Sequence, residues 1–157
     1  MLTYKIHLFR HGITRANLEG RYVGLSDYPL CQEGIDALKE YVKDKDYPPV
    51  EKIYTSPLRR CRETAHILYP GYKTFDVPQL MEMDFGTYEG KTLDELQNDE
   101  SFIAWSRDSM HNAPPEGEDG VAFIRRVIHG LDDVFQDMMA NELHSAALVI
   151  PGGMIKI

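Results

Sequence analysis

A short apolar strand near the start of the chain, with the residues at which it stops, constrains the fold more than any other feature. Residues 2–9 (LTYKIHLF) are almost continuously apolar, and Arg10, His11 and Gly12 follow them directly. Such a run is typical of a strand that is buried on both faces of a parallel sheet. We therefore expect an α/β protein with this strand inside the sheet.

Helical and strand patterns alternate along the rest of the chain. Apolar residues recur at helical spacing from Glu33 onward, and Pro48 and Pro49 are expected to stop that helix. Residues 50–55 are expected to form a second strand. Residues 146–150 are expected to form the last strand, and the order of these elements predicts a largely parallel sheet.

Three further segments have helical character. Ser56 and Pro57 match a helix start, with serine as the cap and proline at the first helical position. The helix ends before Pro70, and residues 92–105 are expected to be helical as well. A longer helix starts near Asp119. The apolar faces are Leu58, Cys61, Ala65 and Leu68 in the first of these helices, and Phe123, Val127, Leu131, Val134 and Met138 in the longest.

Length, charge and cysteine content exclude several classes of protein. A chain of 157 residues fits one domain, and a net charge of −8 argues against a broad nucleic-acid interface. Two cysteines are too few for a disulfide framework. We find no apolar run that could span a membrane and no signal-peptide pattern, because Lys5, His7 and Arg10 interrupt the first apolar stretch. We therefore expect a cytoplasmic protein.

Residues suited to anion binding follow three of the predicted strands. These are residues 10–12 (RHG), 56–60 (SPLRR) and 151–153 (PGG). Ligands bind at the carboxyl ends of the strands in open α/β sheets, arginine donates two hydrogen bonds to a phosphate, and a neutral imidazole can attack phosphorus. The alternative is that these residues are simply solvated or cap a helix.

Four segments, taken in order, resemble the histidine phosphatase superfamily, also called the phosphoglycerate mutase-like family. They are residues 8–17 (LFRHGITRAN), 21–30 (RYVGLSDYPL), 53–65 (IYTSPLRRCRETA) and 80–90 (LMEMDFGTYEG). The resemblance covers nearly the whole chain. It implies a three-layer sandwich with a mostly parallel central sheet flanked by helices, and a single domain over residues 1–157.

The resemblance also implies roles for individual residues. His11 would be the nucleophile that becomes a phosphohistidine, and Arg10 and Arg60 would clamp the phosphoryl oxygens. Glu82 would protonate the leaving oxygen as general acid, with a solvated carboxylate as the alternative. Three residues would bind substrate: Asn17, Arg21 and Gly152. For Asn17 and Arg21, a loop-stabilising hydrogen bond is the alternative.

The sequence departs from the family pattern at its last predicted strand. The family normally places a second histidine before the two glycines, and here that position is Pro151. Proline has no side-chain donor and no backbone N–H, and losing one donor to the transition state costs about 10²–10³-fold in rate. Family members continue beyond the position of Ile157, so we expect the C-terminal elements of the fold to be missing.

The branch of the family is indicated by the residues around Glu82 and further along the chain. Phosphoglycerate mutases usually carry a tyrosine and a lysine where this chain has Phe85 and Leu93, so a mutase is the weaker hypothesis. Residues 104–127 resemble the phosphatase branch, and the chain looks closest to α-ribazole phosphatases of cobalamin assembly. Trp105 is expected to be a packing residue. Glu118 is either a pocket carboxylate or a helix N-terminal charge, and we favour the second.

Two functions follow. The first is a phosphomonoester hydrolase acting on a small phosphorylated metabolite through His11, with no metal and no cofactor. The second is a protein that binds phosphate without turnover, as Pro151 suggests. Inorganic phosphate or sulfate should occupy the pocket in both cases. Nucleic acid and membrane partners are not expected, and a homodimer is possible on the sequence.

Overall fold

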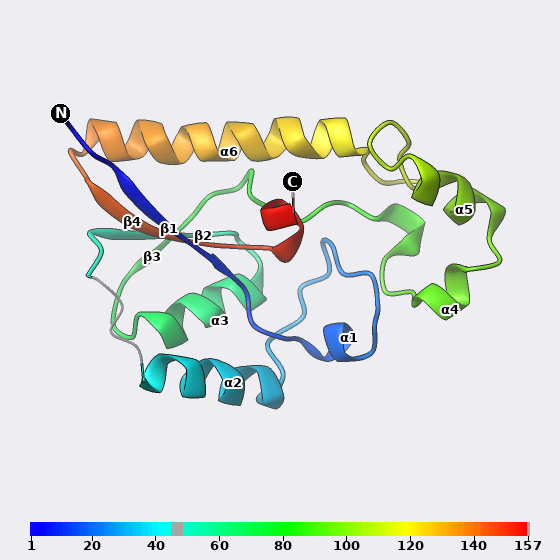
Figure 1. The fold of residues 1–157 in the computed structure, drawn as a ribbon, viewed down its shortest axis with the longest axis horizontal. Coiled ribbons are helices and arrows are strands. Elements are labelled where there is room, and N and C mark those ends of the chain that lie inside the picture. The colour runs from blue at the N-terminus through cyan, green and yellow to red at the C-terminus, as the bar shows by residue number, and fades with distance from the viewer. Residues whose placement is uncertain (45–48, 157) are drawn as a thin grey trace.

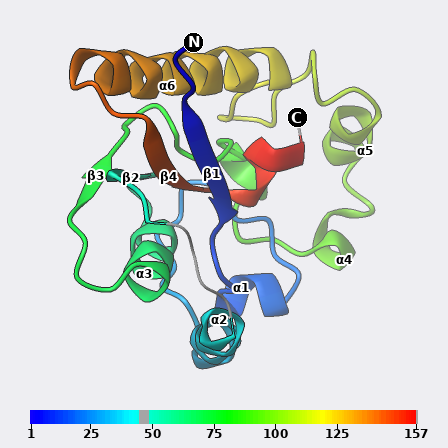
Figure 2. The same cartoon turned by 60° about the vertical axis from the view of Figure 1, so that its left-hand side comes forward.

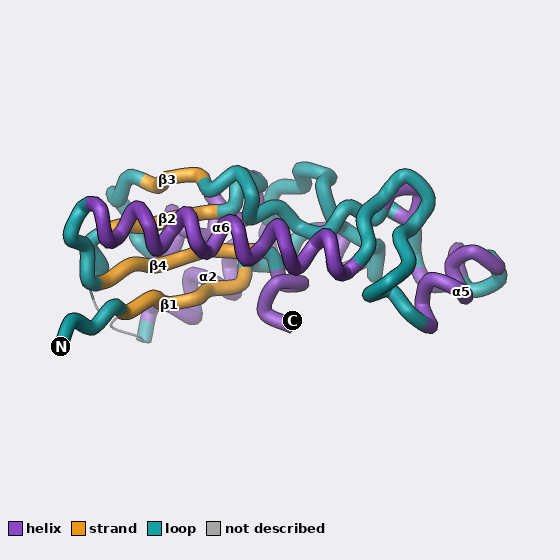
Figure 3. Tube along the Cα trace, turned by 90° about the horizontal axis from the view of Figure 1, so that it is seen from above, coloured by secondary structure: helices purple, strands orange, loops and turns teal. Residues whose placement is uncertain are grey.

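Strand β4 is the centre of a four-stranded parallel sheet in the computed structural model of the chain, which describes residues 1–44 and 49–156. The strands are β1 (Lys5–Arg10), β2 (Lys52–Thr55), β3 (Thr74–Asp76) and β4 (Ser145–Ile150), in the order β1-β4-β2-β3 (Figures 1 and 3). All three pairings are parallel, with Arg10 opposite Ile150 and Thr55 opposite Val149. The residues that follow β1, β2 and β4 therefore meet at one edge of the sheet.

Helices cover both faces of this sheet. Helix α6 (Gly120–Ala140) lies along one face, and α2 (Gln32–Lys43) and α3 (Arg59–Leu68) lie on the other (Figures 1 and 2). The short helices α1 (Arg15–Leu18), α4 (Leu93–Leu96) and α5 (Glu100–Arg107) lie beyond the carboxyl ends of the strands. This arrangement confirms the predicted three-layer α/β fold. None of the described helices combines the length and apolar character needed to cross a membrane.

The alternation of side chains along β4 divides the core in two. Ala146, Leu148 and Ile150 pack into the cluster beneath α6, and Ala147 and Val149 pack into the cluster beneath α3. Successive residues of a strand point to opposite faces, so one central strand supplies both clusters. Burying a side chain such as that of Leu148 contributes about 1.5–3 kcal/mol. The core thus holds the carboxyl end of β4 firmly in place.

The predicted burial of the first strand is wrong. β1 is an edge strand of the described sheet, and the side chain of Leu8 is 55% exposed. An edge strand has a neighbour on one side only, so its faces are covered less completely than those of β4.

Several predicted boundaries also differ from the structure. α3 begins at Arg59 rather than at Pro57, because the backbone of Leu58 is extended (φ −64°, ψ 137°) and this residue is the N-cap of the helix. The predicted helix over residues 92–105 is two helices, α4 and α5. β3 has only three residues and was not predicted. Helix α2 ends at Lys43, and Pro48, expected to stop it, lies outside the described residues.

Helices α6 and α3 confirm the sequence patterns. Asp119 caps α6 by accepting a hydrogen bond from the Ala122 N–H at 2.7 Å, and the predicted stripe is buried except for the half-buried Leu131. The predicted apolar face of α3 is buried, including the free thiol of Cys61. Burial raises the pKa of this thiol to about 12, so Cys61 stays protonated in the core.

Candidate active site

A cavity of about 200 Å³ opens at the carboxyl ends of β1 and β4. Among the residues that line it are all the site residues predicted from the sequence except Arg60. The lining residues are Arg10, His11, Asn17, Arg21, Tyr22, Val23, Glu82, Phe85, Gly152 and Gly153. They come from segments that are distant in the sequence, and the fold brings them to one edge of the sheet.

The His11 side chain is held in one tautomer at the base of this cavity. Its Nδ1 lies 2.6 Å from the carbonyl oxygen of Gly12, and a carbonyl only accepts hydrogen bonds, so Nδ1 carries the proton. Nε2 therefore keeps its lone pair. Burial of the ring lowers the pKa of His11 to about 4, the bond to Gly12 opposes this, and the charges of Arg60 and Arg10 lower it further. The imidazole is neutral at pH 7 and has a free nitrogen to act as a nucleophile.

The loop that carries His11 is fixed from α3. The Gly12 N–H donates to the Thr64 hydroxyl at 2.9 Å, and this hydroxyl donates to the Arg60 carbonyl at 2.7 Å. The loop therefore cannot rotate His11 away without breaking a buried bond. Thr64 was not predicted to contribute to the site, because its contact lies 52 residues away in the sequence.

Arg10 is the free cation of the cavity. Its guanidinium makes no hydrogen bond or ion pair with any described residue, and it lines the cavity beside His11. Gly152 packs directly against it, since a Cβ atom at position 152 would lie 2.5 Å from Arg10 Nε. An unpaired guanidinium at a strand end can bind an incoming phosphoryl group in bidentate fashion.

Arg60 is engaged in a different way. Its side chain is 1% exposed, its Nη1 donates to the Ser26 carbonyl and its Nη2 to the Gly24 carbonyl, both at 2.9 Å. Its Nε is buried without a partner among the described residues. Arg60 lies behind the cavity wall, where it supports the loop at residues 24–26 and contributes positive charge near His11.

Asn17 and Arg21 both line the cavity and both stabilise loops. Asn17 Oδ1 accepts hydrogen bonds from the backbone N–H and the hydroxyl of Thr14, forming a capping box at α1. Arg21 donates to Glu19 at 2.6 Å and to the Gly90 carbonyl at 2.8 Å. Both residues therefore make the loop-stabilising hydrogen bonds that were the alternative to substrate binding. Neither contact of Asn17 uses its Nδ2, which is left to donate into the cavity.

The carboxylate of Glu82 lines the same cavity as His11. It is 7% exposed, and its oxygens accept hydrogen bonds from the N–H groups of Met83 (2.9 Å) and Gly153 (3.0 Å). A Cβ atom at position 153 would lie 2.4 Å from Glu82 Oε1, so only glycine allows this approach. Glu82 is a fixed carboxylate and not a solvated one.

The sequence profile of the Histidine phosphatase superfamily (branch 1) matches residues 6–157. The chain belongs to this superfamily. Its relatives include phosphatases and mutases. It is 35% identical over 142 residues to the adenosylcobalamin/α-ribazole phosphatase of Salmonella typhimurium, covering 85% of this chain and 69% of the relative. It is 33% identical to a 2,3-bisphosphoglycerate-dependent phosphoglycerate mutase of Bifidobacterium longum, covering 73% of this chain and 50% of the mutase.

Solved structures agree with this assignment. The α-ribazole phosphatase of Shigella flexneri superimposes with a TM-score of 0.85 at 28% identity, covering 96% of this chain and 75% of that one. This confirms the phosphoglycerate mutase-like fold. The chain spans about two thirds of the Salmonella relative and half of the mutase, so it is shorter than both.

Pro151 stands where the resemblance to the family leads us to expect a second histidine. It is buried at the end of β4, and Gly152 starts a 3₁₀ turn directly after it. His11 is the only histidine among the described residues that line the cavity. His129 lies on the outer face of α6, and His144 packs against Tyr4 before β4 begins. No other imidazole in the described part of the chain takes the missing place.

Aromatic side chains form the outer wall of the cavity. The ring of Tyr22 lies 5.3 Å from that of Phe85 and 6.1 Å from that of Trp105, in edge-to-face geometry. Trp105 is 8% exposed, which confirms that it is a packing residue. Tyr22 and Phe85 reach the cavity and give it one apolar side.

Glu89 is a supporting residue that the sequence did not reveal. Its carboxylate accepts hydrogen bonds from the Gly24 N–H (2.8 Å) and the Ser26 N–H (3.1 Å), while Arg60 binds the carbonyls of the same two residues. The carboxylate of Glu89 therefore binds the N–H groups of the loop at residues 24–26, and the guanidinium of Arg60 binds its carbonyl groups. In the sequence Glu89 looks like any surface carboxylate, because its partner Gly24 lies 65 residues away.

The described residues hold no group of three or more histidine, cysteine or acidic side chains arranged to bind a metal ion. Unpaired positive charge in the cavity is supplied by Arg10, with Arg60 behind it, whereas Arg21 is paired with Glu19. The arrangement places a nucleophilic nitrogen, a free guanidinium and a fixed carboxylate around one small space, which is what phosphoryl transfer through a side chain requires.

Proposed function

We propose that the protein is a phosphomonoester hydrolase that acts through a phosphohistidine at His11. The observation that carries this proposal is the hydrogen bond from His11 Nδ1 to Gly12, which leaves Nε2 of a neutral imidazole free in the cavity. The free Arg10 and the fixed Glu82, which line the same cavity, supply the charge stabilisation and the proton that the reaction needs.

In the first step the lone pair of His11 Nε2 attacks phosphorus and the ester P–O bond breaks. The carboxylic acid of Glu82 gives its proton to the leaving oxygen, so that a neutral alcohol departs. Arg10 stabilises the negative charge of the phosphoryl oxygens during the transfer.

In the second step a water attacks the phosphohistidine and the P–N bond breaks. The Glu82 carboxylate accepts the proton of that water, and inorganic phosphate and neutral His11 are released. The protons balance over the two steps, because Glu82 gives one and then takes one back.

The substrate we propose is a small phosphorylated metabolite whose phosphoryl group would occupy the cavity of about 200 Å³, and α-ribazole 5′-phosphate is our first candidate. The names of the Salmonella and Shigella relatives support this substrate class. Phe85, where mutases usually carry a tyrosine, speaks against a phosphoglycerate mutase.

Pro151 supports a second candidate, a protein that binds phosphate with little or no turnover. The cavity keeps Arg10 and His11, but a buried proline offers no donor to the phosphoryl oxygens. Phosphate binding without hydrolysis would then be the function of the site.

Hydrolysis of α-ribazole 5′-phosphate and of 4-nitrophenyl phosphate, beside a His11→Ala variant, tests the two candidates. Turnover clearly above the variant supports the hydrolase, and the relative rates rank the substrates. Equal rates, with phosphate binding that depends on Arg10, support the second candidate and reject the first.

A further inference from the structure

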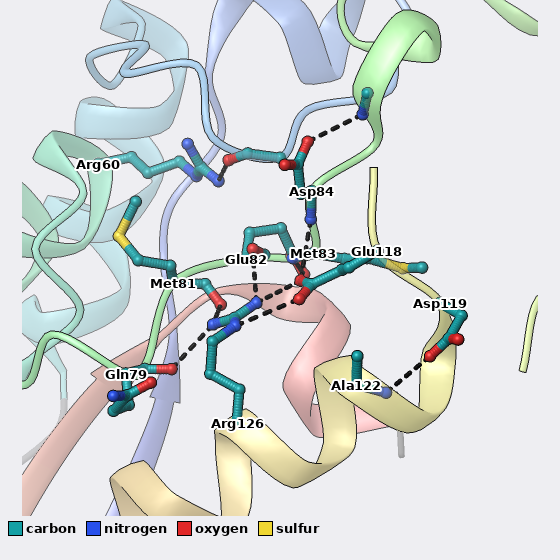
Figure 4. Close-up of polar contacts among 12 residues, drawn as sticks. Arg60, Gln79, Met81, Glu82, Met83, Asp84, Glu118, Asp119, Ala122 and Arg126 are labelled. Carbon is teal, nitrogen blue, oxygen red and sulfur yellow. Dashed lines mark hydrogen bonds and ion pairs between the residues drawn. The ribbon is translucent and has the colours of Figure 1, made fainter. Parts of the chain in front are cut away.

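The backbone that carries Glu82 is gripped by an arginine from α6. Arg126 Nη1 donates to the carbonyls of Gln79 and Met81, both at 2.8 Å, and Nη2 donates to the Glu82 carbonyl at 3.1 Å (Figure 4). One guanidinium thus binds three carbonyls within four residues. Because its planar fork fixes the directions of these bonds, Arg126 fixes the path of the chain up to Glu82.

Glu118 completes the grip on the other side of Glu82. Its Oε1 accepts hydrogen bonds from Arg126 Nη2 at 2.5 Å and from the Asp84 N–H at 3.0 Å, and its own N–H donates to the Asp84 carbonyl at 3.0 Å. The ion pair therefore binds backbone groups before, at and after the residue that bears the carboxylate. Figure 4 shows Arg126 rising from α6 between Glu118 and this segment.

The ion pair of Arg126 and Glu118 is largely shielded from water, and Arg126 is held by a long helix. The side chains of Arg126 and Glu118 are 22% and 19% exposed, so water screens their attraction less than at an open surface. Arg126 lies on the 21-residue helix α6, which packs on the sheet. Neither side chain lines the cavity, so neither touches a bound substrate directly.

The side chain of Glu82 is fixed separately, by the N–H groups of Met83 and Gly153. These two bonds keep their geometry only if the backbone at Glu82 stays in register with the turn after β4. A misplacement of about 1 Å at a reacting group can cost on the order of 10²-fold in rate. The bonds from Arg126 to the backbone therefore also determine the direction of the Glu82 carboxylate.

We infer that Arg126, oriented by Glu118, is a positioning residue that aims the Glu82 carboxyl at the leaving oxygen of the substrate. This inference rests on the proposed function. It assigns to Glu118 a role other than the helix N-terminal charge favoured from the sequence, since its carboxylate binds Arg126 and the Asp84 N–H.

Substrates with different leaving groups test this role. A poor leaving group needs a proton from Glu82 to depart, whereas a good one does not. Arg126→Met keeps an unbranched apolar stem and removes the donors of the guanidinium. We compare kcat/KM, which covers only the steps up to departure of the alcohol, because Glu82 also serves the later hydrolysis of the phosphohistidine on every substrate. We expect kcat/KM to fall about 10²-fold on phenyl phosphate and less than about threefold on 2,4-dinitrophenyl phosphate, whose leaving group departs without a proton. Arg126→Lys should lie between the parent and Arg126→Met. Glu118→Gln should show the same selective loss in weaker form.

Arg125→Met is the matched control, because Arg125 is the neighbouring arginine on α6, is exposed and makes no described hydrogen bond. It should leave both rates unchanged. An equal loss on both substrates in Arg126→Met, with a lowered melting temperature, would show a purely structural role and overturn the inference. No loss on either substrate would overturn it as well.

A second readout does not require turnover. The amide signals of Met83 and Gly153 in NMR spectra report the two bonds to the Glu82 carboxylate. We expect both signals to shift and to exchange faster with solvent in Arg126→Met, and not in Arg125→Met. If the parent fails to exceed His11→Ala on any substrate, the proposed function fails. Unchanged amide signals would reject the positioning role by itself.

Discussion

The Gly153 N–H donates to Glu82 Oε2 at 3.0 Å, across 71 residues of sequence. This bond ties the proposed general acid to the turn that follows Pro151. The resemblance to the family leads us to expect a second histidine at the start of the same turn, so the proline found there and the placement of Glu82 belong to one local structure.

Gly153→Ala should therefore impair activity more than stability. The new Cβ would lie 2.4 Å from Glu82 Oε1 and would push the carboxylate away from the Gly153 N–H. We expect kcat on an unactivated phosphomonoester to fall by about 10²-fold, as for other misplaced catalytic groups.

Gly71→Ala is the contrasting variant for this prediction. Gly71 has a φ of +83°, and no atom lies within 4 Å of the place that a new methyl group would take, so alanine there strains only the backbone. It should cost about 1 kcal/mol in the free energy of unfolding and leave kcat unchanged. Equal activity of the two variants would show that Gly153 does not position Glu82.

The proton affinity of His11 provides a second prediction. Burial lowers its pKa to about 4, against about 6.5 in an unfolded chain. We expect its ring signals in an NMR titration to change near pH 4, with His11→Gln identifying them. A midpoint near 6.5 would show that the ring is accessible to water in solution.

The same pKa sets a sign for stability. Between about pH 6.5 and 4 the unfolded chain binds a proton at His11 and the folded chain does not, so the free energy of unfolding falls as the pH falls. The contribution is about 3 kcal/mol at most over this window. His11→Gln should lose this part of the pH dependence, and urea unfolding of both proteins at several pH values measures it.

Pro151→His should increase turnover. Proline offers no donor at the end of β4, whereas an imidazole there could donate to the phosphoryl oxygens beside His11. One such donor is worth about 10²-fold in kcat. Pro151→Ala removes the proline without adding a donor and should not show this gain. If both variants match the parent, the rate is not limited by the missing histidine.

Glu89→Ala should loosen the loop at residues 24–26. The variant leaves the N–H groups of Gly24 and Ser26 without their charged acceptor, at a cost of about 1–3 kcal/mol. Hydrogen exchange should accelerate at these two amides. Glu40→Ala, at an exposed position of α2, is the control. It should change the free energy of unfolding by no more than about 0.5 kcal/mol and leave hydrogen exchange at these two amides unchanged.

The parts of the fold that follow from local patterns could be predicted from the sequence. The cap of α6 at Asp119 and the buried stripe from Phe123 to Met138 depend on residues a few positions apart. The start of α3 could not be predicted in this way. The Arg59 N–H at its first turn donates to Asp27 Oδ1 at 2.7 Å, so a residue from a remote loop helps to set where the helix begins.

The candidate site also has a part that follows from the local sequence and a part that depends on distant contacts. Arg10 ends β1 and His11 follows it directly, so their place at the sheet edge could be derived from the strand alone. The engagement of Arg60 with the carbonyls of Gly24 and Ser26, and that of Arg126 with the segment before Glu82, could not be derived, because these contacts exist only after distant segments have packed.

The pairing of β1 with β4 has a consequence for how the protein assembles. Lys5 pairs with Ser145, and β2 also pairs with β4, so β4 is the common neighbour of the first two strands and is made last of the four. Contacts so far apart along the chain form slowly, because a long loop must close before they contribute. During synthesis, His11, which follows the first strand, and Glu82 of the later segment must wait for β4 to emerge from the ribosome before a pocket exists.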